Sequence, residues 1–482
     1  MMTPNIQDLA LFKVDLSLLF VAFLIFLMDL VMPAGRKRVL GALTAVLLAT
    51  LFFASFWMEE SGTAFFGAYE GGPWAMFFKR VALAAGALAS LGAIDHVDRH
   101  FPERQGEFYL LLLFSMLGMT LLPGARDLVL FIVCFELMGI PLSMLATYAK
   151  ADDKTGVHRF ASEAGLKLYL VSATSTAITL FGLSFVYGMS GSTKLAVIAT
   201  APASPLLLVG MLLMLAGMAF KVGVVPFHMW IPDTYQGAPT PFVSFLSVGP
   251  KATGMAALVA VLLVAFPSQR SHWIAIVLLM VAVSILMGNL MALPQKDVKR
   301  LLGYSGIAQI GYMMMALVAG GAYGTGMLLF YLAGYLVTNM GAFFVLEALA
   351  PSRAGIEIDD LDGLARRSPW LALALLMFLL SLAGIPFAVG FWAKLYIFMA
   401  AYRADQAWLV LFGALMAIVA LFYYLQVARA AYMKAPRSEE PVRVSFGLAG
   451  AIIVCLVMVV AMGLYPRPFV DGALAASKAL FG

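Results

Sequence analysis

The stretch PLLLVGMLLMLAGMAFKVGVVPFHMWIPDTYQGAPTP, residues 205–241, decides how the rest of the chain is interpreted. It begins with an apolar run long enough for most of a membrane span, since a span needs about 20 residues. Lys221 follows that run, and a charge at the bilayer centre costs roughly 3 kcal/mol. Pro226 lacks the N–H that would bond the carbonyl of Val222, so we expect the helix to break there, close to His228. A lysine beside a broken membrane helix predicts a site that handles protons or ions.

The composition of the whole chain is typical of a membrane protein. Of its 482 residues, 63% are hydrophobic and 12% are charged, and the mean hydropathy is +0.95, whereas soluble domains carry about 25% charged residues. The net charge of +5 is dispersed over short loops, which argues against a nucleic-acid partner. Cys134 and Cys455 lie in apolar segments and give neither a metal nor a disulfide spacing. The first apolar run, 16–32, lacks a cleavage site, so we expect an anchor.

Charged residues, Pro and Gly divide the chain into fourteen apolar segments long enough to span a membrane. The longest loops, near 58–74 and 350–369, are too short for a soluble domain, and nucleotide-binding motifs are absent from the sequence. We therefore expect an all-α polytopic membrane protein whose soluble chemistry belongs to another chain. The predicted spans are 14–33, 40–57, 75–94, 106–123, 127–148, 162–187, 204–226, 241–266, 272–293, 300–319, 323–349, 370–401, 407–432 and 445–465.

The distribution of Lys and Arg predicts the orientation of these spans. Eighteen of the 31 residues fall in one set of alternate loops, and seven fall in the opposite set together with the termini. Because positively charged loops remain in the cytoplasm, we expect both termini on the non-cytoplasmic side. The other six lie within apolar segments: Lys79, Arg80, Lys167, Lys221, Lys251 and Lys394.

Two of the buried charges have structural alternatives that the sequence leaves open. Glu136, near the middle of the fifth segment, is either a protonated carboxyl bonded to a neighbouring helix or a proton site. Lys167 lies about five residues inside the sixth segment. Its side chain either reaches the membrane surface or pairs with Glu163, which are structural roles, or it has a functional role. Lys79 and Arg80 lie close to a segment end, which favours a structural role.

The deeper lysines favour a functional role. Lys251 is about ten residues or more from either end of its segment, too deep to reach the surface easily, and Lys221 lies beside the expected break. A desolvated lysine can hold and release a proton near neutral pH, so both are predicted relay groups. In the tenth segment, the polar side chains of Tyr304, Gln309 and Tyr312 indicate either hydrogen bonds between helices or part of a hydrated path.

The twelfth segment mirrors the seventh. It places Lys394 after Pro386 and its neighbouring phenylalanine, whereas Lys221 precedes Pro226 and its phenylalanine. Helices five apart cross the membrane in opposite directions, as an inverted repeat of five-helix units requires, with helices seven and twelve broken. The expected organisation is a three-helix segment, two five-helix repeats and a C-terminal helix, at residues 1–104, 105–266, 267–433 and 434–482.

At these residues the chain resembles the antiporter-like membrane subunits of respiratory complex I, the proton-pumping NADH-quinone oxidoreductase. Within that family it is most similar to the subunit-N type, through EFYLLLLFSMLGMTLL at 107–122, lysine at 394 and no long C-terminal helical extension. The other matching stretches are the Glu136 segment, Lys167 with its preceding Glu-Ala, KVGVVPFHMWIPDTYQGAPTP, DVKRLLGYSGIAQIGY and SLAGIPFAVGFWAKLYIF.

The resemblance implies a role for each position. Glu136 and Lys221 resemble the family's paired carboxylate and lysine, whose separation gates one half-channel. Lys167 resembles an accessory lysine, Lys251 the central lysine, and Lys394 the lysine that leads towards the outer face. The implied setting is a bacterial inner membrane, with other membrane-arm subunits of complex I (a subunit-M type and small membrane subunits) and lipids as partners. No cofactor is expected on this chain, because NADH, FMN, iron–sulfur clusters and quinone would belong to partner subunits.

Two departures from the family and two rival functions remain. Gln309 stands where many relatives carry histidine, and Pro386-Phe387-Ala388 replaces the usual Pro-Pro-Thr. One rival is a subunit of a multisubunit sodium/proton antiporter, which shares the lysines on broken helices. The other is a structural spacer whose buried charges only hold helices together, although buried ion pairs are weak evidence of stability.

Overall fold

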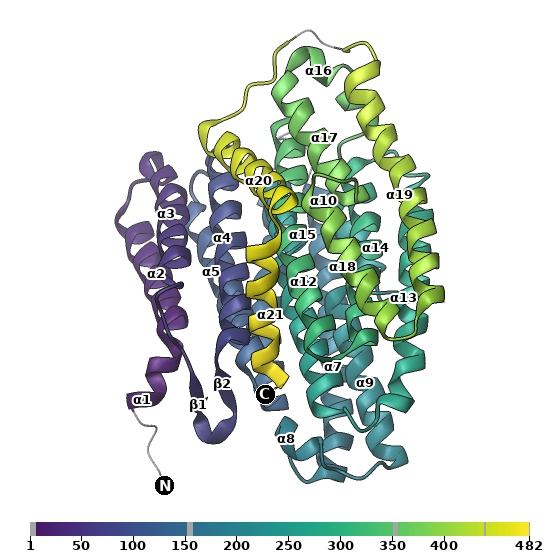
Figure 1. Ribbon diagram of the computed structural model, residues 1–482. Helices are drawn as coiled ribbons and strands as arrows, with labels where there is room; N and C mark the ends of the chain where they lie inside the picture. The colour runs from purple at the N-terminus through teal and green to yellow at the C-terminus, as the bar shows by residue number, and fades with distance from the viewer. Residues whose placement is uncertain (1–5, 152–157, 350–354, 438–439, 482) are drawn as a thin grey trace.

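Helices packed side by side make up almost all of the protein (Figure 1). Among the residues described, twelve helices are long and apolar enough to cross a membrane, and two shorter apolar helices coincide with two further predicted spans. The prediction of an all-α polytopic membrane protein is therefore confirmed, and fourteen spans are compatible with it. The computed structural model describes residues 6–151, 158–349, 355–437 and 440–481. Of the residues used to predict orientation, Lys154 and Arg353 lie outside these ranges.

The N-terminal part holds three long helices and a hairpin that the sequence had predicted as a loop. Tyr69 of the hairpin is buried, and its backbone bridges to Ala125 at the end of the fourth span. This contact and the packing of Tyr69 against Phe12 hold the hairpin against the helices. The elements are α1 (Ile6–Leu9), α2 (Lys13–Val31), α3 (Arg38–Ala54), the antiparallel strands β1 (Gly62–Ala64) and β2 (Tyr69–Gly71), and α4 (Pro73–His100).

The next group contains the stretch that decides the fold. Here two of the predicted spans are interrupted, one between α9 and α10 and one between α11 and α12. Helices α7 and α9 pack closely because Gly182 and Gly210 face each other; a Cβ on Gly210 would lie 2.8 Å from the Gly182 carbonyl oxygen. The elements are α5 (Gln105–Leu121), α6 (Leu128–Ala146), α7 (His158–Ser190), α8 (Leu195–Ile198), α9 (Pro205–Val222), α10 (Trp230–Gly237), α11 (Thr240–Leu246) and α12 (Gly249–Val259).

The third group contains the most buried helices of the bundle. Helices α14 and α15 are almost completely enclosed, whereas α7 and α19 present most of their apolar side chains on the outside. The elements are α13 (Arg270–Ala292), α14 (Val298–Ala319), α15 (Gly321–Leu349), α16 (Leu364–Arg367), α17 (Pro369–Ala383), α18 (Val389–Arg403) and α19 (Ala407–Met433).

The C-terminal part departs from the single helix predicted at 445–465. It contains α20 (Phe446–Leu464) and a second helix, α21 (Arg467–Phe481), separated by Pro466. Helix α21 packs against α15 and α4, and Ser477 donates a hydrogen bond to the Ala322 carbonyl at 2.7 Å. The sequence analysis missed α21 because its charged residues, although they lie on its exposed side, interrupt the sequence and leave no long apolar run.

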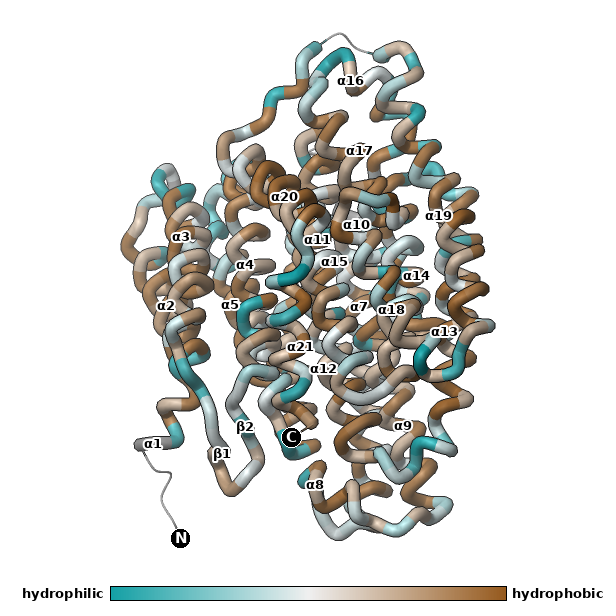
Figure 2. Tube along the Cα trace, viewed as in Figure 1, coloured by the Kyte–Doolittle hydropathy of each residue, from teal (hydrophilic) through white to brown (hydrophobic). Residues whose placement is uncertain are grey.

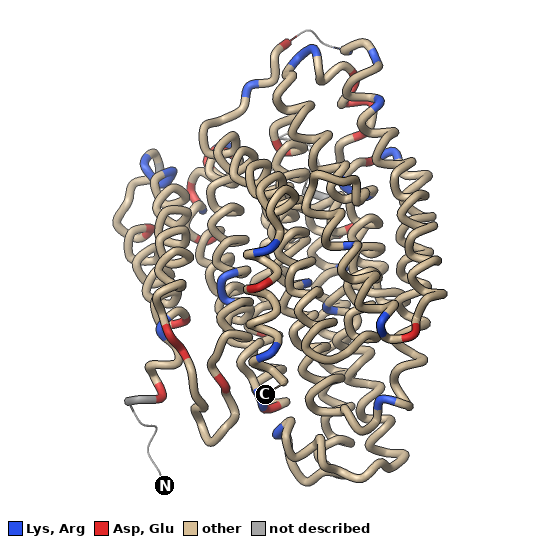
Figure 3. The backbone as a smooth tube through the Cα atoms, viewed as in Figure 1, with Lys and Arg blue, Asp and Glu red and all other residues tan. Residues whose placement is uncertain are grey.

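The outside of the bundle is apolar along the helices and polar at their ends. Figure 2 shows hydrophobic colouring along the outward helices and hydrophilic colouring mainly in the connections. Figure 3 shows Lys, Arg, Asp and Glu gathered around the helix ends, with a few inside the bundle. This distribution is expected when lipid surrounds the helices and water their ends. The charges inside therefore require separate explanation.

Candidate functional site

Two broken helices carry buried lysines, as the sequence predicted, but glycine rather than proline ends each helix. Helix α9 ends at Val222, and Gly223 follows with a left-handed φ of +80°. Helix α17 ends at Ala383, and Gly384 follows with a φ of +90°. Left-handed backbone at the residue after a helix is typical of glycine, which has no Cβ to clash. The expected loss of a Pro226 hydrogen bond to Val222 is thus not what terminates α9.

The two ends also share their capping hydrogen bonds. The amides of Gly223 and Val224 both donate to the Ala219 carbonyl, at 2.9 and 3.1 Å. The amides of Gly384 and Ile385 both donate to the Leu380 carbonyl, at 3.0 and 3.0 Å. After each break the chain resumes as a new helix, α10 or α18. The interruption is therefore a stable, hydrogen-bonded feature of the fold.

At the first break Lys221 pairs with Glu136 of α6, as the sequence predicted for these two residues. The Lys221 Nζ lies 3.3 Å from Glu136 Oε1 and donates to Ser172 Oγ at 2.6 Å. The Thr176 hydroxyl also hydrogen-bonds Glu136 Oε1. Only 9% of the lysine side chain is exposed, compared with 31% for the glutamate. Glu136 thus connects a buried cation to the outer surface of this chain.

Two cavities meet at Lys221. One, of about 30 Å³, is lined by Lys221, Ser172 and Pro250, among other residues. The second, of about 10 Å³, is lined by Lys221 and Thr176, among others. Since Pro250 directly precedes Lys251, the larger cavity extends from the first relay lysine to the backbone beside the second.

Lys251 lies in the first turn of α12, after a second interruption between α11 and α12. It is 1% exposed, and its Nζ has no hydrogen-bond partner among the described residues. The Nζ lies 5.5 Å from the ring centre of Tyr235 and 5.8 Å from that of Tyr335. A lysine in a buried aromatic setting without a counter-charge is rare unless it functions.

Lys394 lies buried in α18, and its partners are backbone atoms. Its Nζ donates to the carbonyls of Leu382 and Ala383, at 2.7 and 2.9 Å, in the last turn of α17. The Nζ also lies 5.1 Å from the ring centre of Tyr312. The negative end of the helix dipole and two carbonyl groups therefore stabilise this cation.

Gln309 links Lys394 to other polar groups. Its Nε2 donates to the same Leu382 carbonyl at 2.9 Å, and its Oε1 accepts from the Tyr331 hydroxyl at 2.5 Å. The structure thus brings Gln309 and Tyr312 to Lys394. It does not place Tyr304 there, because that side chain is half-buried against the apolar core.

Lys167 and His228 lie outside these relay positions. The Lys167 Nζ is 2.6 Å from Glu163, the pair foreseen as one alternative, and 2.6 Å from Asp233. Arg300 in turn lies 2.5 Å from Asp233, which makes a chain of partly exposed ion pairs. His228 lies partly exposed in the first break, and its Nδ1 has no hydrogen-bond partner within the described part of the chain.

One ion cluster was missed by the sequence analysis. Lys79 was placed near a segment end, yet its side chain is fully buried, 2.5 Å from Asp15 and 2.5 Å from Glu60. The structural role favoured for it is supported, because the cluster ties α2 and the chain before β1 to α4. Arg80 donates to the Ser55 carbonyl at 2.9 Å. Among the described residues, His, Cys, Asp and Glu form no group of three that could hold a metal ion.

Known proteins similar to this chain share its membrane-spanning part. Residues 125–420 match the family model described as "NADH:quinone oxidoreductase/Mrp antiporter, TM". The chain is 40% identical to NADH-quinone oxidoreductase subunit N of Moorella thermoacetica, covering 94% of this chain and 95% of that protein. It is 36% identical to NADH-quinone oxidoreductase subunit N of Desulfitobacterium hafniense, covering 98% and 99%.

Solved structures of related proteins share the fold of this chain. A chain of respiratory complex I from Thermus thermophilus superimposes with a TM-score of 0.82 at 32% identity, covering 96% of this chain and 100% of that one. A chain of the Mrp complex from Dietzia sp. superimposes with a TM-score of 0.86, but at 19% identity it shows the fold alone. The family resemblance inferred from the motifs is confirmed: the chain belongs to the NADH-quinone oxidoreductase subunit N family.

Proposed function

We propose that this chain translocates protons as a membrane subunit of an NADH-quinone oxidoreductase, with Glu136, Lys221, Lys251 and Lys394 as the transferring groups. One observation supports this assignment above the others: each lysine is largely or fully buried beside an interrupted helix. Interrupted membrane helices expose backbone dipoles inside the protein, where they stabilise ions and water. Three such positions in one chain favour a relay over a spacer.

The relay starts at the Glu136–Lys221 pair. At an effective dielectric constant of 20, opposite charges about 4 Å apart attract each other by roughly 4 kcal/mol. Movement of Glu136 away from Lys221, driven by a neighbouring subunit, removes this attraction, and the lysine then gives up its proton more readily. The partial exposure of Glu136 supports this control point, because a partner can reach it.

The proton then passes to Lys251 and Lys394. The cavity between Lys221 and Pro250 leads towards Lys251. Tyr331 is connected through Gln309 to the Leu382 carbonyl, to which Lys394 also donates a hydrogen bond. These groups orient water and hydrogen bonds without ionising, and Lys394 releases the proton towards the outer face. Lys167 serves as an accessory charge near the cytoplasmic end.

The membrane location, the internal repeats and the partner subunits of this chain belong to the same proposal. The bacterial relatives support a bacterial inner membrane, and the bias of Lys and Arg supports both termini on the non-cytoplasmic side. The shared Gly caps of α9 and α17 support two related halves, at 105–266 and 267–433. NADH, flavin, iron–sulfur clusters and quinone are bound by partner subunits, so this chain moves protons but performs no redox step.

Lys251→Ala tests the relay in the assembled complex. We expect NADH-driven proton pumping into inverted membrane vesicles to be almost abolished, because the central group is gone. Lys296→Ala is the control, since Lys296 is an exposed lysine of the same charge. Full coupled pumping by Lys251→Ala would refute the relay.

Mass spectrometry of the purified complex tests the setting at the same time. Subunits bearing flavin and iron–sulfur clusters should accompany the chain. A set of small antiporter subunits without a redox protein would instead identify a sodium/proton antiporter, a function that the family model's description also covers.

A further inference from the structure

A row of buried polar groups leads to Lys251 from the His96–Glu347 pair, which is not part of the relay described above. The pair joins α4 to α15, with His96 Nδ1 2.9 Å from Glu347 Oε1. The other carboxylate oxygen of Glu347, Oε2, is buried without a hydrogen-bond partner among the described residues. Burying a carboxylate oxygen without a partner is costly, so this arrangement requires an explanation.

The upper end of the row is open to the side rich in Lys and Arg. Glu347 is only 3% exposed, but His96 and His100 are partly exposed at the end of α4. The two imidazole rings lie 4.4 Å apart, and His100 Nδ1 is 2.9 Å from the His96 carbonyl oxygen. Solvent on this side therefore reaches Glu347 through titratable imidazoles.

Hydroxyl and amide groups continue the row through the middle of the bundle. Thr240, Ser244 and Ser247 are buried and lie at positions i, i+4 and i+7, on one face of α11 and the turn that follows it. Asn339 of α15 donates to Ser247 Oγ at 2.7 Å, and its Oδ1 is another buried oxygen without a partner in the described chain. Helix α11 packs against both α4 and α15, and the stretch from Thr240 to Ser247 is about as long as the two turns, about 12 Å, that separate Glu347 from Asn339 on α15.

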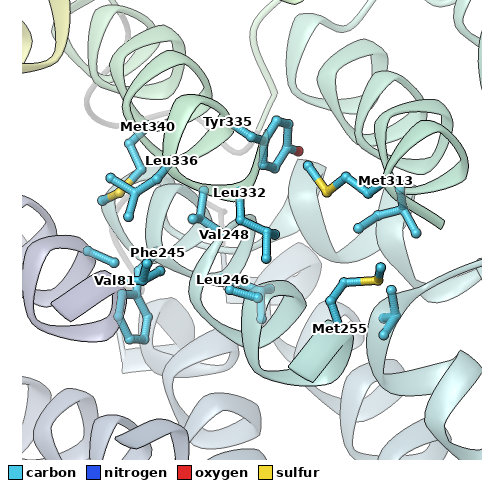
Figure 4. Close-up of a cluster of buried hydrophobic side chains, with 14 of the residues drawn as sticks. Val81, Phe245, Leu246, Val248, Met255, Met313, Leu332, Tyr335, Leu336 and Met340 are labelled. Carbon is cyan, nitrogen blue, oxygen red and sulfur yellow. The ribbon is translucent and has the colours of Figure 1, made fainter. Parts of the chain in front are cut away.

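The row ends at Lys251, within an apolar wall. Tyr335 lies one turn along α15 from Asn339, and its hydroxyl, the Tyr235 hydroxyl and Lys251 Nζ are all buried and unpartnered within the described ranges. Figure 4 shows Tyr335 among labelled apolar side chains that include Met255, Met313 and Leu332. Because the surrounding side chains are apolar, hydrogen-bonded connections to Lys251 from this side run through the row of polar groups. Buried polar atoms of this kind are satisfied by ordered water.

We infer that this row is a second proton-uptake path, in which Glu347 receives protons at His96 and passes them along α11 and Asn339 to Lys251. The inference rests on the proposed function, because it adds a second route by which protons reach Lys251, while the Glu136–Lys221 pair still controls their onward transfer. Its alternative is a purely structural staple between α4 and α15. The staple accounts for the ion pair, but it leaves unexplained the unpartnered atoms at Asn339 and Tyr335.

Substitutions in the complex separate the two roles. Glu347→Gln keeps the hydrogen-bond acceptor for His96 but cannot ionise, and Asn339→Leu interrupts the row far from the pair. For both we expect fewer protons pumped per electron, a loss smaller than that of Lys251→Ala, with assembly unchanged. Glu347→Asp should restore pumping. His96→Gln breaks the pair but leaves the carboxyl, so it should cost less than Glu347→Gln.

Double variants complete the test. Glu347→Gln combined with Lys251→Ala should pump no worse than Lys251→Ala alone, because both residues act in one path. Wild-type pumping by Glu347→Gln and Asn339→Leu, beside a defective Lys251→Ala, would overturn this inference and leave the proposed function standing. Losses in Glu347→Gln and His96→Gln that merely follow reduced assembly would identify the staple. Normal pumping by Lys251→Ala would instead remove the proposed function.

Discussion

The two broken helices hold their lysines in different ways. They share the left-handed glycine and the capping pattern, but Lys221 precedes its break and Lys394 follows its own. Lys221 contacts side chains, the carboxylate of Glu136 and the hydroxyl of Ser172. Among the residues that the structure describes, Lys394 donates hydrogen bonds only to backbone carbonyls, and these belong to the end of α17.

This difference indicates that the first break controls proton transfer, whereas the second break only conducts protons. A side-chain carboxylate can rotate away from its partner, so the attraction at the first break can be switched by a neighbouring subunit. Carbonyl groups at a helix end stay where the helix puts them, so the second break offers a constant electrostatic environment. The comparison predicts that the first site depends on one particular charge pair and the second on backbone geometry.

Removing the carboxylate gives the largest expected effect. Glu136→Gln preserves size and hydrogen bonding but abolishes the switchable charge, so we expect almost complete loss of NADH-driven proton pumping. Glu136→Gln combined with Lys221→Met should be no worse than either single variant, since the two residues act as a unit. Pumping is measured by dye quenching in inverted vesicles.

Glu70→Gln is the control for this pair, because Glu70 is a partly exposed carboxylate that pairs with Arg126 away from the relay. It should pump normally. If Glu136→Gln also pumped normally, the first break would resemble the second, and charge separation would no longer distinguish them.

Substituting the capping glycines tests the backbone side of the comparison. Gly223→Ala and Gly384→Ala each force a Cβ into left-handed backbone, at a cost of about 1–2 kcal/mol in the free energy of unfolding. At Gly384 the new Cβ would lie 2.9 Å from Lys394 Cδ, whereas at Gly223 it would meet Ile231. Gly384→Ala should therefore reduce pumping more than Gly223→Ala.

Thermal denaturation of the purified complex measures the loss of stability in the two glycine variants, and vesicle assays measure their loss of proton pumping. Gly188→Ala provides the control, since a Cβ there meets no atom within 4 Å. Equal pumping by the two capping variants would contradict a special dependence of Lys394 on backbone geometry.

The sequence predicted the spans and the lysines because membrane physics acts on short stretches. A run of apolar residues must span, and a charge within it must be explained, so Lys221, Lys251 and Lys394 stood out. Pairings between distant residues have no such local signal. Asp15 and Glu60 meet Lys79 from 64 and 19 residues away, and Glu347 meets His96 from 251 residues away.

Local backbone geometry was predicted only in part. Proline marked the neighbourhood of each break, but the helices end at Gly223 and Gly384, three and two residues earlier. Gly384 stood out in the sequence only together with Pro386 and Gly390, as residues that disturb the helix before Lys394, and Gly223 did not stand out, because a left-handed φ depends on how the helix end is packed. The division at Pro466 was missed for another reason, because the segment after it contains no long apolar run.

Gln309→His gives the smallest expected effect and sharpens what the second break requires. A neutral imidazole offers one N–H donor and one acceptor, which match the bonds that Gln309 makes to the Leu382 carbonyl and from the Tyr331 hydroxyl. We therefore expect nearly unchanged pumping and a change in unfolding free energy below about 1 kcal/mol.

Gln309→Leu is the matched contrast, because it fills similar space but removes both bonds. It leaves the buried Tyr331 hydroxyl without its acceptor, at a cost of about 1–3 kcal/mol, and should lower pumping. If Gln309→His behaved like Gln309→Leu, or if it raised pumping well above the wild type, an ionising group at this position would matter. The second break would then depend on side-chain charge as the first does, and its backbone carbonyls alone would not define the site.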